Sequence, residues 1–207
     1  MKSDIALDSI TDGVQMFTYC TNLESFTSDL SSLKDGRGMF SGCMSLTSFD
    51  SDLSSLKDGT SMFLYCMELE SFTSSLNSLE NGNTMFAINS NLKYINTNMP
   101  KLKIMDGMFI ACDALESFTG DLSNTISAHE MFGNIIINGT YCPNLTSFTG
   151  DLSSLKFGYC MFWNCTNLTS FTGDLSSLIC GGAMFQKTKL NPQSVSIIVN
   201  TVKDVKE

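Results

Sequence analysis

A Met-Phe pair recurs along the chain at an almost constant interval. It stands at residues 16–17, 39–40, 62–63, 85–86, 108–109, 131–132, 161–162 and 184–185. Six of the seven intervals are 23 residues long and one is 30. Self-similarity at a fixed period of about 20 to 50 residues is the signature of repeat architectures. The period therefore requires a fold in which each copy packs on the next in the same way.

Alignment on this pair brings further apolar residues into columns. The unit reads M-F-x-x-C-x-x-L-x-S-F-x-x-D-L-x-x-L-x-x-G-x-x. The leucine column contains Leu23, Leu46, Leu69, Leu92, Leu115, Leu145 and Leu168, and the strand column contains Phe26, Phe49, Phe72, Ile95, Phe118, Phe148 and Phe171. A single copy cannot bury such residues, so neighbouring copies must cover them. We predict a repeat solenoid over residues 1–190, a leucine-rich-repeat-like right-handed coil of eight 23-residue repeats.

Within the unit, local patterns predict the path of each coil. Segments of the L-T-S-F-T type, such as residues 145–149 and 168–172, alternate apolar and β-branched polar residues and predict short parallel β-strands in one sheet. A second short extended segment is expected at S-S-L-K, and a tight helical turn at M-F-x-x-C. A corner with positive φ is expected at the glycine column, which contains Gly13, Gly36, Gly59, Gly82, Gly158 and Gly181.

The two ends of the array differ. Asn191 followed by Pro192 resembles a helix N-cap, and Val195, Ile198, Val199 and Val202 follow at helical spacing. A capping helix is therefore predicted over residues 192–205, within a C-terminal segment of residues 191–207. At the other end, residues 6–17 align with residues 29–40, so we expect an exposed coil edge there, or one continued by a larger parent protein. Such an edge can pair with other chains, which would give a homo-oligomer.

The single 30-residue interval places an insertion at residues 133–141. It contains an Asn-Gly pair flanked by β-branched and aromatic residues, which favours a protruding loop or hairpin. Its isoleucines either pack over the neighbouring coil or contact a partner. The next coil carries aromatic residues where other coils have polar ones. We take these residues together as the candidate binding patch, with local packing under the insertion as the alternative: Ile135, Ile136, Ile137, Tyr141, Phe157, Tyr159 and Trp163.

Two columns of reactive side chains have simpler structural explanations. Six of the eight cysteines share one column, and we expect them to be free, buried thiols because side chains on a parallel ladder point the same way. The aspartate column contains Asp29, Asp52, Asp121, Asp151 and Asp174, and we expect these residues to cap backbone amides in turns. His129 is the one histidine and lies at a variable corner. The sequence therefore predicts no catalytic, metal or cofactor site.

The repeat resembles a known family. The Leu, Phe, Met-Phe and Cys columns over residues 6–188 are similar to the BspA-like leucine-rich repeats of bacterial surface proteins, which phage tail proteins also carry. The resemblance implies a recognition or adhesion module, on a cell surface or a virion, with no catalytic residues to transfer.

Charge narrows the set of partners. The chain has 12 Lys and Arg against 21 Asp and Glu, a net charge of −9. This charge argues against nucleic acid and against direct membrane binding, and the start of the chain has no apolar run that would form a signal peptide. The leading hypothesis is therefore a module that binds a protein or glycan receptor. The alternative is a structural spacer or assembly subunit that acts through its coil edge.

Overall fold

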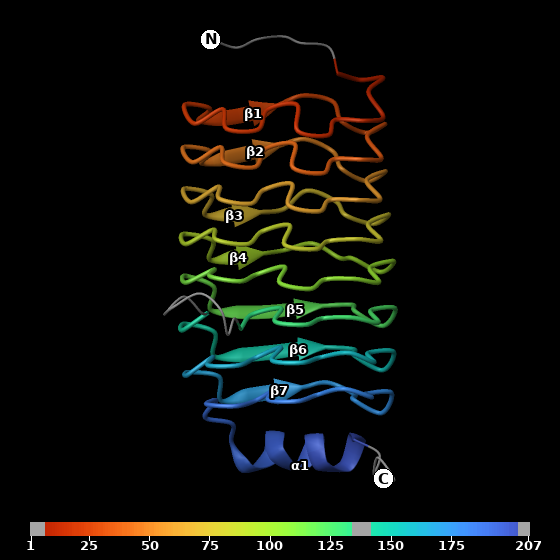
Figure 1. Ribbon diagram of the computed structural model, residues 1–207, viewed down its shortest axis with the longest axis vertical. Coiled ribbons are helices and arrows are strands. Elements are labelled where there is room, and N and C mark those ends of the chain that lie inside the picture. The colour runs from red at the N-terminus through yellow and green to blue at the C-terminus, as the bar shows by residue number, and fades with distance from the viewer. Residues whose placement is uncertain (1–6, 134–141, 203–207) are drawn as a thin grey trace.

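The computed structural model describes residues 7–133 and 142–202, which form an elongated stack of coils with a helix at the C-terminal end (Figure 1). One short strand appears per turn of the chain, always on the same side of the stack. The strands are β1 Ser25–Thr27, β2 Ser48–Asp50, β3 Ser71–Phe72, β4 Tyr94–Ile95, β5 Ser117–Gly120, β6 Ser147–Gly150 and β7 Ser170–Thr172, and the helix is α1 Pro192–Thr201.

The strands pair in parallel and in repeat register, so that Phe26 faces Phe49 and Phe148 faces Phe171. The prediction of one sheet was wrong in detail. The strands form three sheets, β1-β2, β3-β4 and β5-β6-β7, with no hydrogen-bonded pairing between β2 and β3 or between β4 and β5.

A second line of pairing joins the coils on another side of the stack. Parallel bridges run without interruption from Asp12 through Asp35 and Asp58 to Cys180. This line lies one residue beyond the S-S-L-K segments, so the extended segment predicted there is one residue later and only one bridge long. It holds the coils together where the strands do not pair.

The segment around each Met-Phe pair is not the helical turn that we expected. Alternate N–H groups, such as those of Gly36, Gly38 and Phe40, donate to carbonyl groups of the next coil at 2.9 Å. The intervening N–H groups of Met39 and Ser41 donate three residues back within the coil, at 3.0–3.1 Å. Residues before Met and before the cysteine-column position, which is Asn89 in one coil, take positive φ to allow this alternation, among them Gly38, Gly42, Ser61, Tyr65, Thr84 and Ile88.

The glycine column is required for a different reason from the one predicted. None of its six members has positive φ. A Cβ at Gly13 would instead lie 2.8 Å from Sδ of Met39 in the next coil, and one at Gly59 would lie 3.0 Å from Sδ of Met85. In five of the six positions glycine is present because the methionine of the following coil packs directly on its backbone, and at Gly181 the Leu178 side chain takes that place.

The core consists of stacked side chains that repeat from coil to coil. The phenylalanines of the Met-Phe pairs stack with ring centroids 5.3–5.7 Å apart. The strand phenylalanines form a second stack, which meets the first edge to face, as Phe49 meets Phe63 at 4.8 Å. Edge-to-face and offset-stacked rings each add about 0.5–1.5 kcal/mol beyond burial. Ile95 replaces one ring and interrupts the second stack.

The C-terminal helix covers the last strand, as predicted, but ends at Thr201, not at residue 205. Asn191 caps it by accepting a hydrogen bond from the Ser194 N–H at 2.8 Å. The Ser194 hydroxyl in turn accepts from the Phe171 N–H of β7 at 2.9 Å, in place of a next strand. Ile198 and Val202 pack on the core, whereas Val195 and Val199 are exposed, so the apolar face is narrower than their spacing suggested.

Candidate recognition surfaces

The predicted binding patch is only partly within the described residues. Ile135, Ile136, Ile137 and Tyr141 lie outside them. Phe157 and Tyr159 are 37% and 38% exposed. They flank His129, with ring centroids 6.0 and 6.5 Å from the imidazole. The Tyr159 N–H donates to Nδ1 of His129 at 3.2 Å. We call these three residues the His129 cluster.

Trp163 makes its contacts toward the following coil. Its Nε1 donates to Oε1 of Gln186 at 3.2 Å, and Nζ of Lys187 lies 4.8 Å from the ring centroid, in a cation–π contact. Gly133, the first residue of the insertion, packs closely against the backbone of Trp163, because a Cβ at Gly133 would lie 2.7 Å from the Trp163 backbone nitrogen. Trp163 is therefore packed by its neighbours more than Phe157 and Tyr159 are.

The aspartate column caps turns, as predicted. Each of its five carboxylates accepts a hydrogen bond from the backbone N–H two residues later, at 2.8–3.0 Å. Hydrogen bonds from the hydroxyl and the backbone N–H of Ser31 lower the pKa of Asp29, and those from the backbone N–H and the hydroxyl of Ser123 lower the pKa of Asp121. The carboxylates of this column are occupied by hydrogen bonds with the backbone and do not form a row of cation ligands.

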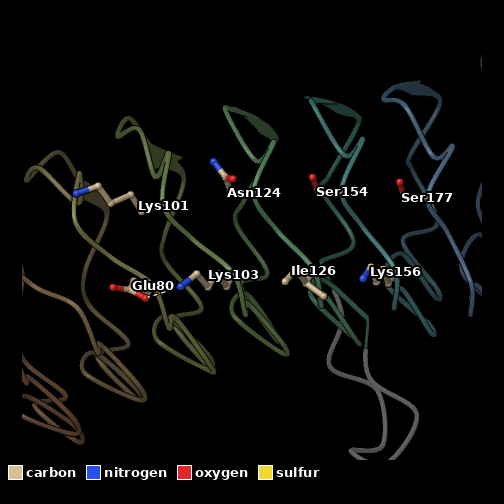
Figure 2. A pocket seen from close by; sticks show the side chains of 8 residues that line it. All are labelled: Glu80, Lys101, Lys103, Asn124, Ile126, Ser154, Lys156 and Ser177. Carbon is tan, nitrogen blue, oxygen red and sulfur yellow. Dashed lines mark hydrogen bonds and ion pairs between the residues drawn. The ribbon is translucent and has the colours of Figure 1, made fainter.

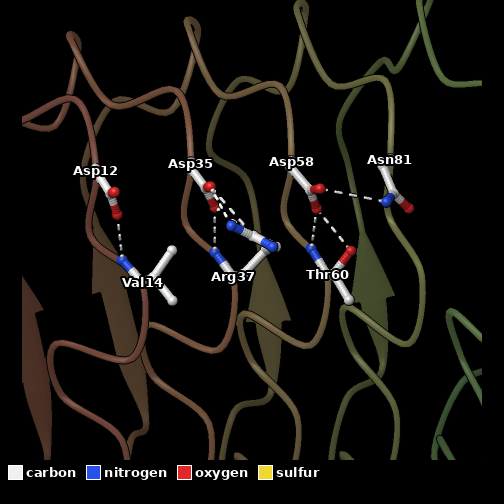
Figure 3. Close-up of polar contacts among 7 residues, drawn as sticks. All are labelled: Asp12, Val14, Asp35, Arg37, Asp58, Thr60 and Asn81. Atoms are coloured by element: carbon white, nitrogen blue, oxygen red, sulfur yellow. Dashed lines mark hydrogen bonds and ion pairs between the residues drawn. The ribbon is translucent and has the colours of Figure 1, made fainter.

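A second column of caps was not predicted. Asp12, Asp35 and Asp58 each accept from the N–H two residues later, at 3.0–3.2 Å (Figure 3). Asn81 accepts from the Asn83 N–H at 3.2 Å in the same way. Arg37 also donates to both carboxylate oxygens of Asp35, which lowers the pKa of that carboxyl. The Asp-Gly dipeptides at residues 12–13, 35–36 and 58–59 and the Asn-Gly dipeptide at residues 81–82 could have revealed this column.

The cysteine column is buried, as predicted, except for Cys20 in the first coil. The Cys43, Cys66, Cys112 and Cys142 thiols donate to a phenylalanine carbonyl of the preceding coil, at 3.0–3.3 Å. Burial raises the pKa of Cys43 to about 11 and of Cys165 to about 12. These thiols are therefore protonated near neutral pH and are poor nucleophiles.

A hollow of about 490 Å³ gathers three lysines on one side of the stack, beside the second line of pairing (Figure 2). Lys103 is neutralised by Glu80, with Nζ and Oε2 2.7 Å apart. The Lys101 side chain points away from the other two lysines, toward the earlier coils. Because the three ammonium groups do not point toward one common position, the hollow does not form an anion-binding site.

A polar groove on the strand side was missed by the sequence reasoning. It comprises a hollow of about 620 Å³ between β4 and β5 and an adjoining one of about 260 Å³ over β3 and β4. The two hollows share Asn96, Asn98 and Thr119. The available signal was the cluster of departures from the unit at residues 94, 95, 96 and 98, where Tyr, Ile, Asn and Asn replace Ser, Phe, Thr and Asp.

The comparisons with known proteins concern the repeat. A model of the BspA type leucine-rich repeat region, in six copies, matches residues 9–138 and 140–206. The chain belongs to the BspA-type leucine-rich repeat family. No curated protein matches it. A crystal structure of a leucine-rich repeat protein from Bacteroides ovatus is similar at 20% identity, with 86% of this chain and 68% of that chain covered and a TM-score of 0.32.

For this BspA-type protein, membership of the family suggests a binding or adhesion module. Within residues 7–133 and 142–202, no helix is long and apolar enough to span a bilayer. In the same residues, no group of three or more His, Cys, Asp and Glu side chains is arranged to hold a metal ion.

Proposed function

We propose that this protein is a non-catalytic recognition module of a bacterial surface or a virion, which binds a protein or glycan receptor. In this proposal a right-handed array of eight coils is a rigid support, and the ligand contacts the outside of the coils near residues 129–163. The proposal separates two roles. Residues in the repeat columns stabilise the stack, and residues that depart from the repeat contact the ligand.

The observation that carries the proposal is the His129 cluster. The columns that contain Phe157 and Tyr159 have Asp35, Arg37 and Thr60 in earlier coils. Partly exposed aromatic rings in place of polar residues lower the solubility of a protein, so they usually mark a binding surface. Aromatic residues are also enriched where proteins bind partners. Trp163, with Lys187 over its ring, extends the aromatic surface toward the next coil.

The cysteine column, the aspartate column and His129 are engaged in structural contacts. The column thiols have raised pKa values, and the column carboxylates hold backbone amides. Nδ1 of His129 accepts from a backbone N–H, and among the described residues no serine or cysteine side chain forms a hydrogen bond with the imidazole. Nucleophilic catalysis requires such a pair. These contacts support a binding role over an enzymatic one.

The test replaces the exposed rings by residues that their own columns contain. A Phe157→Asp/Tyr159→Thr variant and the wild type are measured by biolayer interferometry against immobilised glycans and purified cell-surface glycoproteins. Ile179→Lys is the matched control, because Ile179 is 63% exposed and Lys156 precedes it in the same column. We expect the double variant to lose at least about tenfold in affinity, as hot-spot aromatics do, and the control to bind like the wild type. Equal binding by all three chains refutes the assignment.

A second function is favoured by the first coil. Val14, Met16 and Tyr19 are 38%, 45% and 68% exposed on it. Apolar side chains beside unpaired backbone groups suit coil-on-coil assembly. Light scattering over a concentration series tests this role, with Tyr19→Asn as the variant, because Asn164 occupies the same left-handed position in a later coil. Association that Tyr19→Asn abolishes supports assembly, and a monomer at every concentration contradicts it.

A further inference from the structure

The strand side of the stack opens between β4 and β5. The second line of pairing continues through the same coils, from Asn81 to Ile104 to Ser127, so the coils themselves remain stacked. Between β2 and β3, which are also unpaired, the Phe49 and Phe72 rings still stack at 6.0 Å. Between β4 and β5 that stack is also interrupted, by Ile95. The 620 Å³ hollow lies at this opening.

Two adjacent turn caps are missing beside the opening. Ser75 and Asn98 occupy the column whose aspartates elsewhere accept the N–H two residues later. The residue two after Asn98 is Pro100, which has no N–H to donate. Oγ of Ser75 is buried and has no hydrogen-bond partner among the described residues. Both side chains line the 260 Å³ hollow. Polar groups that stabilise the turn in other coils are therefore free in these two.

The other lining residues are neutral hydrogen-bonding side chains. Within the part of the chain that the structure describes, the amides of Asn77, Asn96 and Asn98 form no side-chain hydrogen bond, and each offers both donors and an acceptor. The carboxylate of Asp121 accepts from the Ser123 N–H at 3.0 Å. At the edge of the opening, the Tyr94 ring is 57% exposed.

This set of groups favours one class of ligand. The groove has no lysine or arginine among its lining residues, and Asp121 and the net charge of −9 both oppose an anion. Its walls carry few apolar side chains, which does not suit a lipid or a helix. A neutral sugar presents hydroxyl groups at its edge and C–H groups on its face. Amides and hydroxyls match the edge, and an exposed tyrosine ring matches the face.

We propose that the groove from β3 to β5 binds a neutral oligosaccharide, with Tyr94 under one sugar ring and with Ser75, Asn96 and Asn98 as hydrogen-bonding partners. The inference rests on the proposed recognition function and adds to it a ligand class and a second face.

The test uses the whole chain and a variant that restores the repeat. The combined changes Tyr94→Ser, Asn96→Thr, Asn98→Asp and Pro100→Ser introduce the residues that other coils have at these positions, so the variant should fold. Both chains are applied to an array of neutral hexose and N-acetylhexosamine oligosaccharides, with sialylated and sulfated ones included. Tyr65→Asn, on the opposite segment of a coil and 38% exposed, is the control.

We expect binding to neutral oligosaccharides by the wild type and by Tyr65→Asn. Tyr94→Ser alone should weaken it roughly 2- to 10-fold, and the combined variant should abolish it. Binding confined to acidic oligosaccharides, no binding to the array, or equal binding by the combined variant overturns the inference. If the receptor panel above still detects binding that depends on Phe157 and Tyr159, the proposed function stands without the groove.

Discussion

Gly36 and Gly38 lie two residues apart and are glycine for different reasons, which predicts different costs of replacement. A Cβ at Gly36 would lie 3.0 Å from both Sδ of Met62 and Cδ1 of Leu56, at a φ that any residue can adopt. A Cβ at Gly38 would meet only Cγ of Gln15, at 3.3 Å, but φ is +61°.

The size of each effect follows from these contacts. Overpacking costs about 1–3 kcal/mol, and the loss of unfolded-state freedom from Gly to Ala returns about 0.4–1 kcal/mol. Gly36→Ala should therefore destabilise by roughly 1–2 kcal/mol, which lowers Tm by roughly 2–8 °C in a chain of this size. Gly38→Ala should cost a similar amount, about 0.5–1.5 kcal/mol, because the left-handed backbone costs about 1–2 kcal/mol and the unfolded state again returns part of it.

A double-mutant cycle with Met62→Ala separates the two causes. The two glycine substitutions have similar costs, but only Gly36→Ala should be coupled to Met62→Ala. In urea unfolding, the cost of Gly36→Ala should fall by about half or more once Met62 is truncated, since only the Leu56 contact then remains, whereas the cost of Gly38→Ala should be unchanged. Additive costs for Gly36→Ala and Met62→Ala would refute the claim that the methionine requires the glycine.

Three further outcomes are expected. Ser194→Ala should cost about 1–3 kcal/mol in urea unfolding, because the buried Phe171 N–H loses its acceptor, and exposed Ser196→Ala should stay within about 0.5 kcal/mol; equal costs would contradict the edge-capping role. Burial raises the pKa of the column thiols, such as that of Cys43 to about 11 from 9.0, so the unfolded chain ionises first and the free energy of unfolding should fall as pH rises above about 9. A flat profile from pH 8 to 11 would argue against buried thiols. Phe63 contacts four rings at 4.8–5.6 Å, so Phe63→Ala should cost about 3–5 kcal/mol and exceed Phe185→Ala, at the half-buried end of the stack.

The period of the sequence was sufficient to predict the fold but not its backbone. Each column of large apolar residues became a buried stack, because a residue that recurs at every turn meets its own copy in the next coil. The glycine column was misread, since a sequence shows a missing Cβ but not whether φ or a neighbour requires it. The turn segment was missed because residues such as Thr84 and Ile88 rarely take positive φ, and only contacts with the next coil keep them there.

The candidate surfaces were predicted less completely than the core. Phe157 and Tyr159 stood out because they are bulky where other coils are polar, and the structure brings them together around His129. The groove was overlooked because its residues are small and polar, like most of the surface. The groove forms because the departures from the repeat coincide with the loss of pairing between β4 and β5 and of two turn caps. Such losses become visible only in three dimensions.

The central claim is that column residues stabilise the stack while departures from the repeat bind the ligand. Its most direct test measures receptor binding and the thermal midpoint together, for the wild type and for Phe157→Asp/Tyr159→Thr. We predict a loss of binding of at least about tenfold, with a midpoint within roughly 2 °C of the wild type, since surface changes stay near 0.5 kcal/mol. Unchanged binding, or a midpoint that falls as far as for a core variant, would contradict the claim.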